Sequence, residues 1–229
     1  MAKKRGKFIV IDGTDGSGKA TQVSLLVKKL EKQKIKVRHI DFPRYDSNFF
    51  GRFIGECLRG DYGNFVKLDP RIASVLYAAD RWEAGGDIAR WLSEGYVVIA
   101  DRYVSSNQIH QGGKIKDPLE RRKFLSWLSQ MEYGTFKIPK PHAIVYLDVP
   151  LEVSRKLLKE AQAKKTYLQG KKDTVERNLK YGQDSRESAM RLIEQDNQWH
   201  RIECVEDGKL LSPESVHEKV LSAVKRYFK

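Results

Sequence analysis

Phe8-Ile-Val-Ile-Asp-Gly-Thr-Asp-Gly-Ser-Gly-Lys-Ala-Thr21 is the stretch of this sequence that indicates its fold most directly. It starts as an apolar, β-branched run typical of a buried strand, and a helical pattern follows it. In such a turn, successive backbone N–H groups and the helix N-terminus can hold phosphate groups. Gly13 and Gly18 allow the chain to turn tightly, and Lys19 can reach the β- and γ-phosphate oxygens of a nucleotide.

One position departs from the usual form of this loop. The common pattern has Ser or Thr directly after the lysine, whereas this chain has Ala20, with Thr21 one residue later. The strand, the spacing, the lysine and the helix nevertheless agree, so we predict a phosphate-binding loop. Its expected nucleotide-binding residues are Gly13, Thr14, Asp15, Gly16, Ser17, Gly18, Lys19, Ala20 and Thr21.

The composition is that of one basic globular domain. With 229 residues, of which 40% are hydrophobic, residues 1–229 fit a single domain with a small lid. The net charge of +13 favours polyanionic partners such as nucleotides or nucleic acid. The two cysteines suggest neither a disulfide scaffold nor a metal site, and no apolar run is long enough for a leader or a membrane span. We therefore expect a cytoplasmic location and no membrane partner.

Strand-like and helical patterns alternate along the chain. Helical apolar stripes include one at Ile72, Val75, Leu76 and Ala79, which Gly85-Gly86 should interrupt. Alternation of this kind predicts an α/β fold with a five-stranded parallel sheet covered on both faces. The expected strands are Phe8–Ile11, Val37–Phe42, Tyr96–Ala100, Ala143–Val149 and Ile202–Val205.

Ligands of such folds bind beyond the carboxyl ends of the strands. Besides the phosphate loop, Asp41-Phe42-Pro43-Arg44 and Asp101-Arg102-Tyr103 should lie at this edge. A proline that directs an arginine into a phosphate site suits a fixed turn, and we predict a cis peptide bond between Phe42 and Pro43.

These segments together resemble the thymidylate kinases over nearly the whole chain. The resemblance depends on Asp15 in the loop, Phe42-Pro43-Arg44-Tyr45, Leu76-Tyr77-Ala-Ala-Asp80-Arg81-Trp82-Glu83 and Asp101-Arg102-Tyr103-Val-Ser-Ser106-Asn107. It implies a P-loop NTPase-type three-layer α/β/α fold with a small helical lid. It also implies transfer of the γ-phosphoryl group of ATP to dTMP with Mg²⁺, and a homodimer formed through a helical face such as that of Ile72–Ala79.

The resemblance also assigns the residues around the acceptor phosphate. Guanidinium groups at strand ends can clamp a phosphate bidentately, and the family implies this role for Arg44 and Arg102. A structural ion pair with Asp41 or Asp101 is the alternative. Asp15 is implied to hold the 3′-hydroxyl of the acceptor sugar, so Lys19, Arg44, Arg102 and Asp15 are the expected catalytic residues.

Base recognition is implied to fall to residues on two helical segments. Tyr77 and Arg81 lie one helical turn apart, so they share a helix face; the ring is implied to stack on thymine and Arg81 to donate to a base carbonyl. His110 stands where the family often has an aromatic ring near the sugar 2′ position. The expected dTMP-binding residues are Asp15, Phe42, Arg44, Tyr77, Arg81, Arg102, Ser106, Asn107 and His110.

Metal and lid residues are less determined by the sequence. Because Ala20 lacks a hydroxyl, Mg²⁺ must be held by water, phosphate oxygens or Asp101. A basic lid is expected at about residues 155–172, and Gly16 in the loop points to the family variant whose catalytic cation lies in that lid. The lid candidates are Arg155, Lys164, Lys165 and Glu176.

Three alternatives to a dTMP kinase remain open at this point. One is a kinase for another nucleotide or for a deoxynucleoside, although Arg44 and Arg102 disfavour an acceptor without a phosphate. Another is a basic nucleic-acid-binding ATPase module, suggested by the net charge of +13; no cluster of base-stacking aromatic residues supports it, and no nucleic acid partner is expected. The last is a non-catalytic nucleotide-binding protein, suggested by Ala20.

Overall fold

The computed structural model describes residues 5–161 and 179–228. Its centre is a five-stranded sheet in the order β2-β3-β1-β4-β5, and every neighbouring pair is parallel. The predicted parallel sheet is therefore confirmed. The strands are β1 (Lys7–Gly13), β2 (Val37–Asp41), β3 (Val97–Asp101), β4 (Ala143–Asp148) and β5 (Trp199–Glu203), and a small hairpin of β6 (Val205–Glu206) and β7 (Lys209–Leu210) follows them.

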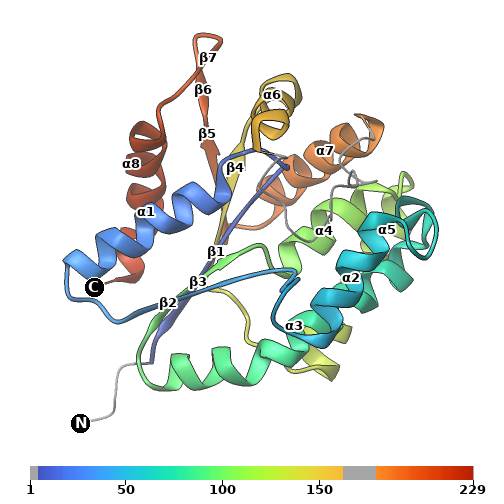
Figure 1. Ribbon diagram of the computed structural model, residues 1–229, viewed down its shortest axis with the longest axis horizontal. Helices are drawn as coiled ribbons and strands as arrows, with labels where there is room; N and C mark the ends of the chain where they lie inside the picture. Colours follow the sequence, from blue (N-terminus) through green and yellow to red (C-terminus); the bar gives the residue numbers. More distant parts are fainter. Residues whose placement is uncertain (1–4, 162–178, 229) are drawn as a thin grey trace.

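Helices cover both faces of the sheet, as Figure 1 shows. Successive residues of a strand point to opposite faces, so β1 contributes Phe8 and Val10 to one core and Ile9 and Ile11 to the other. The second core is closed by α1 (Lys19–Lys32) and α8 (Pro213–Val224). The first is closed by α3 (Pro70–Ser93), α4 (Val104–Gly113), α5 (Pro118–Ser129) and α7 (Leu179–Gln195).

Other helical segments complete the fold. The helix α2 (Phe49–Arg59) packs on α3 through a small third core that includes Ile54, Leu58 and Phe65. A 3₁₀ turn, η1 (Phe65–Lys67), joins α2 to α3, and a π-helical turn, η2 (Gln130–Thr135), continues α5. The helix α6 (Leu151–Ala161) follows β4.

The prediction that Gly85-Gly86 interrupts its helix is wrong, because α3 continues without a break to Ser93. Each glycine costs a helix about 1 kcal/mol relative to alanine. Gly85 is buried, and a Cβ atom there would lie 3.2 Å from the Ile138 side chain. The helix thus keeps its conformation because close packing at Gly85 offsets the weak intrinsic propensity.

The apolar stripe near the start of α3 faces outward in part. Ile72 and Val75 are 58% and 41% exposed, whereas Ala79 is buried. In the part of the chain that the structure describes, no helix has the length and apolar character needed to cross a bilayer.

Candidate active site

The glycine-rich loop lies between β1 and α1 at the carboxyl edge of the sheet, as predicted. Gly18, which precedes α1, has a left-handed backbone with φ 85°, a conformation that glycine adopts at no steric cost. The helices α2, α3, α5 and α8 each begin with a side chain that caps the first turn, whereas α1 has none. The first N–H groups of α1 are therefore available to an anion.

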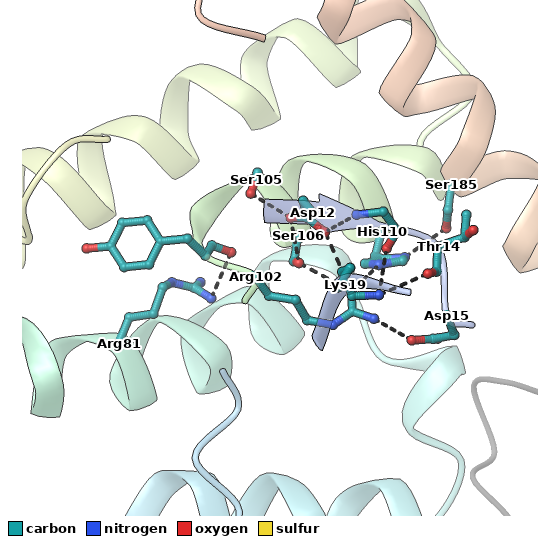
Figure 2. Close-up of polar contacts among 12 residues, drawn as sticks. Asp12, Thr14, Asp15, Lys19, Arg81, Arg102, Ser105, Ser106, His110 and Ser185 are labelled. Atoms are coloured by element: carbon teal, nitrogen blue, oxygen red, sulfur yellow. Dashed lines mark hydrogen bonds and ion pairs between the residues drawn. The ribbon is translucent and has the colours of Figure 1, made fainter. Parts of the chain in front are cut away.

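Lys19 lies across this loop (Figure 2). Its Nζ donates to the carbonyl oxygens of Gly13 and Thr14 at 3.2 and 2.9 Å. Burial and the positive charge of Arg102 lower the pKa of the Lys19 ammonium. The hydroxyls of Thr14 and Ser17 are buried and have no hydrogen-bond partner among the described residues. Because phosphate oxygens accept hydrogen bonds, a phosphate chain would satisfy these donors.

Asp12, at the end of β1, ties the loop to α4. This fully buried carboxylate accepts hydrogen bonds from the Gly13 N–H at 2.8 Å and from the hydroxyls of Ser105 and Ser106 at 2.6 and 2.9 Å. Nη1 of Arg102 lies 3.7 Å from the same carboxylate. Asp12 therefore fixes the start of α4 against the phosphate loop.

Arg102 points from the end of β3 toward the phosphate loop (Figure 2). Nη2 forms a short ion pair with Asp15, and Nη1 lies 3.2 Å from Nε2 of His110 and 3.4 Å from the Ser106 hydroxyl. Burial alone would lower the pKa of the guanidinium, but the nearby carboxylates outweigh it and raise the pKa above its usual value. Among the described residues, Arg102 forms ion pairs with Asp15 and Asp12. It forms none there with Asp101, the partner expected if the arginine had a purely structural role.

His110 connects Arg102 to α7. Burial and the charge of Arg102 lower its pKa to about 4, so the ring is neutral at physiological pH. Its Nε2 must accept from the guanidinium, which can only donate. The proton is therefore on Nδ1, 3.0 Å from the Ser185 hydroxyl. The ring also stacks on Tyr181, with planes 2° apart.

Arg44 follows β2, and the preceding Phe42–Pro43 peptide bond is cis, which confirms the prediction. The Arg44 N–H lies 3.3 and 3.4 Å from the two carboxylate oxygens of Asp80, which is fully buried in α3. A Cβ atom at Gly51 would lie 2.1 Å from the Arg44 carbonyl oxygen, so only glycine fits there. The Arg44 guanidinium itself has no hydrogen-bond or ion-pair partner within the described residues.

Arg81 and Asn107 meet at a residue that the sequence did not identify, Glu132 of η2. Arg81 donates from Nε and Nη2 to the two Glu132 oxygens at 2.8 and 2.6 Å, and from Nη1 to the Tyr103 carbonyl oxygen at 3.3 Å. Asn107 donates to the Glu132 carboxylate and to the Ser74 carbonyl oxygen, both at 3.2 Å. Burial would lower the pKa of Arg81, but Glu132 raises it above its usual value.

The two aromatic residues expected at the acceptor site differ in exposure. Tyr77 is half-buried and meets Phe65 edge to face at 5.7 Å. Phe42 is only 5% exposed and packs against Tyr103 in the first core. Its contact with a nucleotide stays a prediction.

Asp101 ends β3 beside the phosphate loop and is the expected metal ligand. Burial raises the pKa of its carboxyl, while the charges of Lys19 and Arg102 oppose that effect. The described residues contain no cluster of three or more His, Cys, Asp or Glu side chains that could hold a metal. Mg²⁺ needs no such cluster in a nucleotide site, because one or two carboxylates, phosphates and waters can complete its shell.

Of the four lid candidates, the structure describes Arg155 alone. Arg155 is an exposed residue of α6. Lys164, Lys165 and Glu176 lie outside the described residues, as does most of the expected lid segment.

No role was predicted from the sequence for Asp12, Asp80, Glu132 and Ser185. In the structure these residues hold the predicted cations or their neighbours in place. For Glu132 a signal was present. Phe124, Leu128 and Glu132 stand four residues apart and are all fully buried, so a carboxylate continues the apolar face of a helix. Buried carboxylates are rarely left unpaired, and this pattern predicts a buried cation opposite Glu132.

A parallel five-stranded sheet with a glycine-rich phosphate loop after its first strand defines a P-loop protein that binds nucleotides. A family profile described as thymidylate kinase matches residues 11–219. The chain belongs to the thymidylate kinase family.

Individual relatives agree with this assignment. The thymidylate kinase of Plasmodium falciparum is 32% identical over 148 residues, which are 65% of this chain and 64% of that protein, just under two thirds of its length. A probable thymidylate kinase of Pyrococcus abyssi is 30% identical over 96% of this chain and 97% of its own. The solved structure of a thymidylate kinase from Candida albicans has the same fold, with a TM-score of 0.73, 22% identity, and coverage of 98% of this chain and 94% of that one.

Proposed function

We propose that this protein transfers the γ-phosphoryl group of ATP to dTMP and so produces ADP and dTDP for dTTP synthesis. The observation that carries the proposal is the position of Lys19 and Arg102 at one edge of the sheet. Lys19 is held by buried hydrogen bonds and Arg102 by partly buried contacts, and Arg81 and Asn107, which both bind Glu132, lie on the helices beside them. The family match favours this activity over a nucleic-acid-binding ATPase module or a non-catalytic nucleotide-binding protein.

Charge neutralisation is the main chemical task in such a transfer. The attacking group is an oxygen of the dTMP phosphate, which is largely dianionic at neutral pH because its second pKa is about 6. No base has to remove a proton, and catalysis consists of positioning and electrostatic stabilisation. Lys19 neutralises the β- and γ-phosphates of ATP, and Arg44 and Arg102 bind the acceptor phosphate.

The contacts of Arg102 fix its guanidinium before substrate binds. A guanidinium has five N–H donors, and Asp15, His110 and Ser106 face only the two Nη atoms. Nε–H and a second N–H of Nη2 have no partner among the described residues and can bind a phosphate. Asp15, whose side chain is 32% exposed, binds the 3′-hydroxyl of the acceptor sugar while it orients Arg102.

Mg²⁺ fits this site as a companion of ATP. Bound Mg²⁺ supplies positive charge that neutralises phosphate oxygens during transfer. Asp101 would hold it together with phosphate oxygens and water, because Ala20 offers no hydroxyl. The buried, unpartnered hydroxyls of Thr14 and Ser17 provide further donors around the phosphate chain.

Three further features complete the proposal. A basic lid at about residues 155–172 closes over the nucleotides, and Arg155 on α6 lies at its start. A homodimer forms through α3, where Ile72, Val75 and Trp82 expose apolar surface; a monomer in light scattering at micromolar concentration would rule it out. The cytoplasmic location stays a prediction.

A coupled assay with ATP, Mg²⁺ and a panel of monophosphates tests this function. dTMP is expected to be the best acceptor, followed by dUMP, because one methyl group in an apolar pocket is worth only about 1–3 kcal/mol. dCMP and dGMP should be much poorer acceptors, since they present the wrong hydrogen-bonding groups. ADP formation without a preference for dTMP would contradict the proposal.

A further inference from the structure

Within the described part of the chain, Glu132 is the only residue seen to bind both Arg81 and Asn107, two of the predicted dTMP-binding residues. It is fully buried, and its carboxylate accepts two hydrogen bonds from Arg81 of α3 and one from Asn107 of α4. Figure 2 shows Arg81 beside the Arg102 cluster, with its guanidinium near the start of α4. Glu132 thus joins two helices next to the proposed acceptor site.

The contacts of Asn107 fix the direction of its amide. Its two partners, the Glu132 carboxylate and the Ser74 carbonyl oxygen, can only accept hydrogen bonds. The amide nitrogen must therefore face them, and it spends both of its N–H groups there. Oδ1 of Asn107 has no partner in the described part of the chain, and it is an acceptor.

After its contacts within the protein, Arg81 still has N–H groups that can donate to a ligand. Its Nε and one N–H of Nη2 bind Glu132, and one N–H of Nη1 binds the Tyr103 carbonyl oxygen. One N–H on each Nη atom remains without a partner among the described residues. Glu132 therefore presents a fixed donor, from Arg81, and a fixed acceptor, from Asn107.

We propose that Glu132 is a positioning residue that selects pyrimidines with a 4-oxo group and an N3–H group. The inference rests on the proposed function and names what sets its base preference. The 4-oxo oxygen accepts from Arg81 and N3–H donates to Asn107. Cytosine reverses both positions, with an amino donor at C4 and an acceptor at N3, so both contacts would be lost. Discrimination of this kind exceeds what apolar fit provides, because buried polar groups are left unpaired.

A purely structural ion pair would predict something different. If Glu132 only neutralised Arg81, and its hydrogen bond with the Asn107 amide played no part in base choice, loss of Glu132 would lower thermal stability without changing the base preference. Arg121 on α5 offers a matched control, because it is also buried and donates to Ser188 of α7, away from Arg81 and Asn107.

The experiment compares the full-length wild type, Glu132→Gln, Glu132→Asp and Arg121→Met. For each, kcat and KM are measured for dTMP and dCMP, together with the KM for ATP and the Tm. In Glu132→Gln the Asn107 amide can rotate, and we expect the dTMP:dCMP ratio of kcat/KM to fall by about tenfold or more, mainly through the KM for dTMP. The KM for ATP should stay unchanged.

The other variants keep the test decisive if Glu132→Gln does not fold. Glu132→Asp retains the charge opposite Arg81 but cannot reach all its partners, so an intermediate ratio is expected. Arg121→Met should lower Tm and keep the wild-type ratio. The inference is overturned, and the proposed function is not, if a folded Glu132 variant keeps the wild-type dTMP:dCMP ratio. The same holds if this ratio follows Tm in all three variants. Failure of the wild type to phosphorylate dTMP overturns the proposed function, and the inference with it.

Discussion

Replacing Arg102 with lysine separates the charge of this residue from its shape. The two Nη atoms of Arg102 face in different directions, one to Asp15 and the other to His110 and Ser106. A lysine carries its donors on one nitrogen, so it can keep only one of these two sides. The positive charge remains, while the fork that would bind the acceptor phosphate is lost.

The contacts give the expected size of the effect. Two charge-assisted hydrogen bonds from the fork to the phosphate become one, and a hydrogen bond to a charged group contributes about 1.5–3 kcal/mol. A tenfold change in rate corresponds to about 1.36 kcal/mol, so kcat/KM for the acceptor should fall by about 10- to 150-fold. Phosphate contacts carry no base information, and the loss should therefore be the same for dTMP, dUMP and dCMP.

Steady-state kinetics with the coupled assay measure this effect at saturating ATP. Arg90→Lys is the matched control, because Arg90 of α3 is 56% exposed and, as far as the structure describes the chain, pairs only with nearby surface carboxylates. It should retain wild-type kinetics. Two results would refute the placement of Arg102 at the acceptor phosphate. One is a loss of activity with dTMP while dUMP and dCMP are unaffected; the other is a raised KM for ATP with an unchanged acceptor KM.

Three other substitutions test neighbouring parts of the site. Lys19→Ala should lower kcat by more than a hundredfold, since transition-state charge stabilisation of this kind is worth about 3–4 kcal/mol; a circular dichroism melt should show that the fold survives. Arg81→Ala should raise the dTMP KM and weaken the preference over dCMP. It should also destabilise the fold by about 3–5 kcal/mol, because it leaves the buried Glu132 charge unpaired, and urea unfolding measures this loss. His110 has a folded pKa of about 4 against 6.5 for the free side chain, so the unfolded chain binds more protons between these values. The free energy of unfolding should therefore decline as pH falls from about 6.5 toward 4, by about 2–3 kcal/mol at pH 4.5, and His110→Phe should lack this decline relative to wild type in urea unfolding.

Local patterns predicted the strands and the phosphate loop because both depend on neighbours in sequence. The alternation of Phe8, Ile9, Val10 and Ile11 between two cores follows from strand geometry alone. The continuity of α3 through Gly85 was not predictable in this way, since it depends on packing against Ile138, which lies far along the chain.

The contacts that position the site are long-range, and a single sequence does not show them. Asp12 binds Ser105, 93 residues away, and Arg81 binds Glu132, 51 residues away. In the sequence, Asp12 continues the apolar run of the first strand, so its neighbours give no sign of a hydrogen-bond partner. Glu132 differs, because it follows Phe124 and Leu128 at a spacing of four residues, and this helical pattern could have predicted a buried cation opposite it.

Carboxylates behind the predicted cations explain how the site is made ready for its ligands. Asp15 holds Arg102 and Glu132 holds Arg81, while Asp80 holds the backbone of Arg44. Buried ion pairs contribute little net stability, so stability alone does not account for this repeated arrangement. An arginine side chain carries about 2 kcal/mol of rotamer entropy. Because contacts within the fold hold Arg102 and Arg81 in place, that cost falls on folding, and the free energy of each phosphate or base contact is available for binding and transfer.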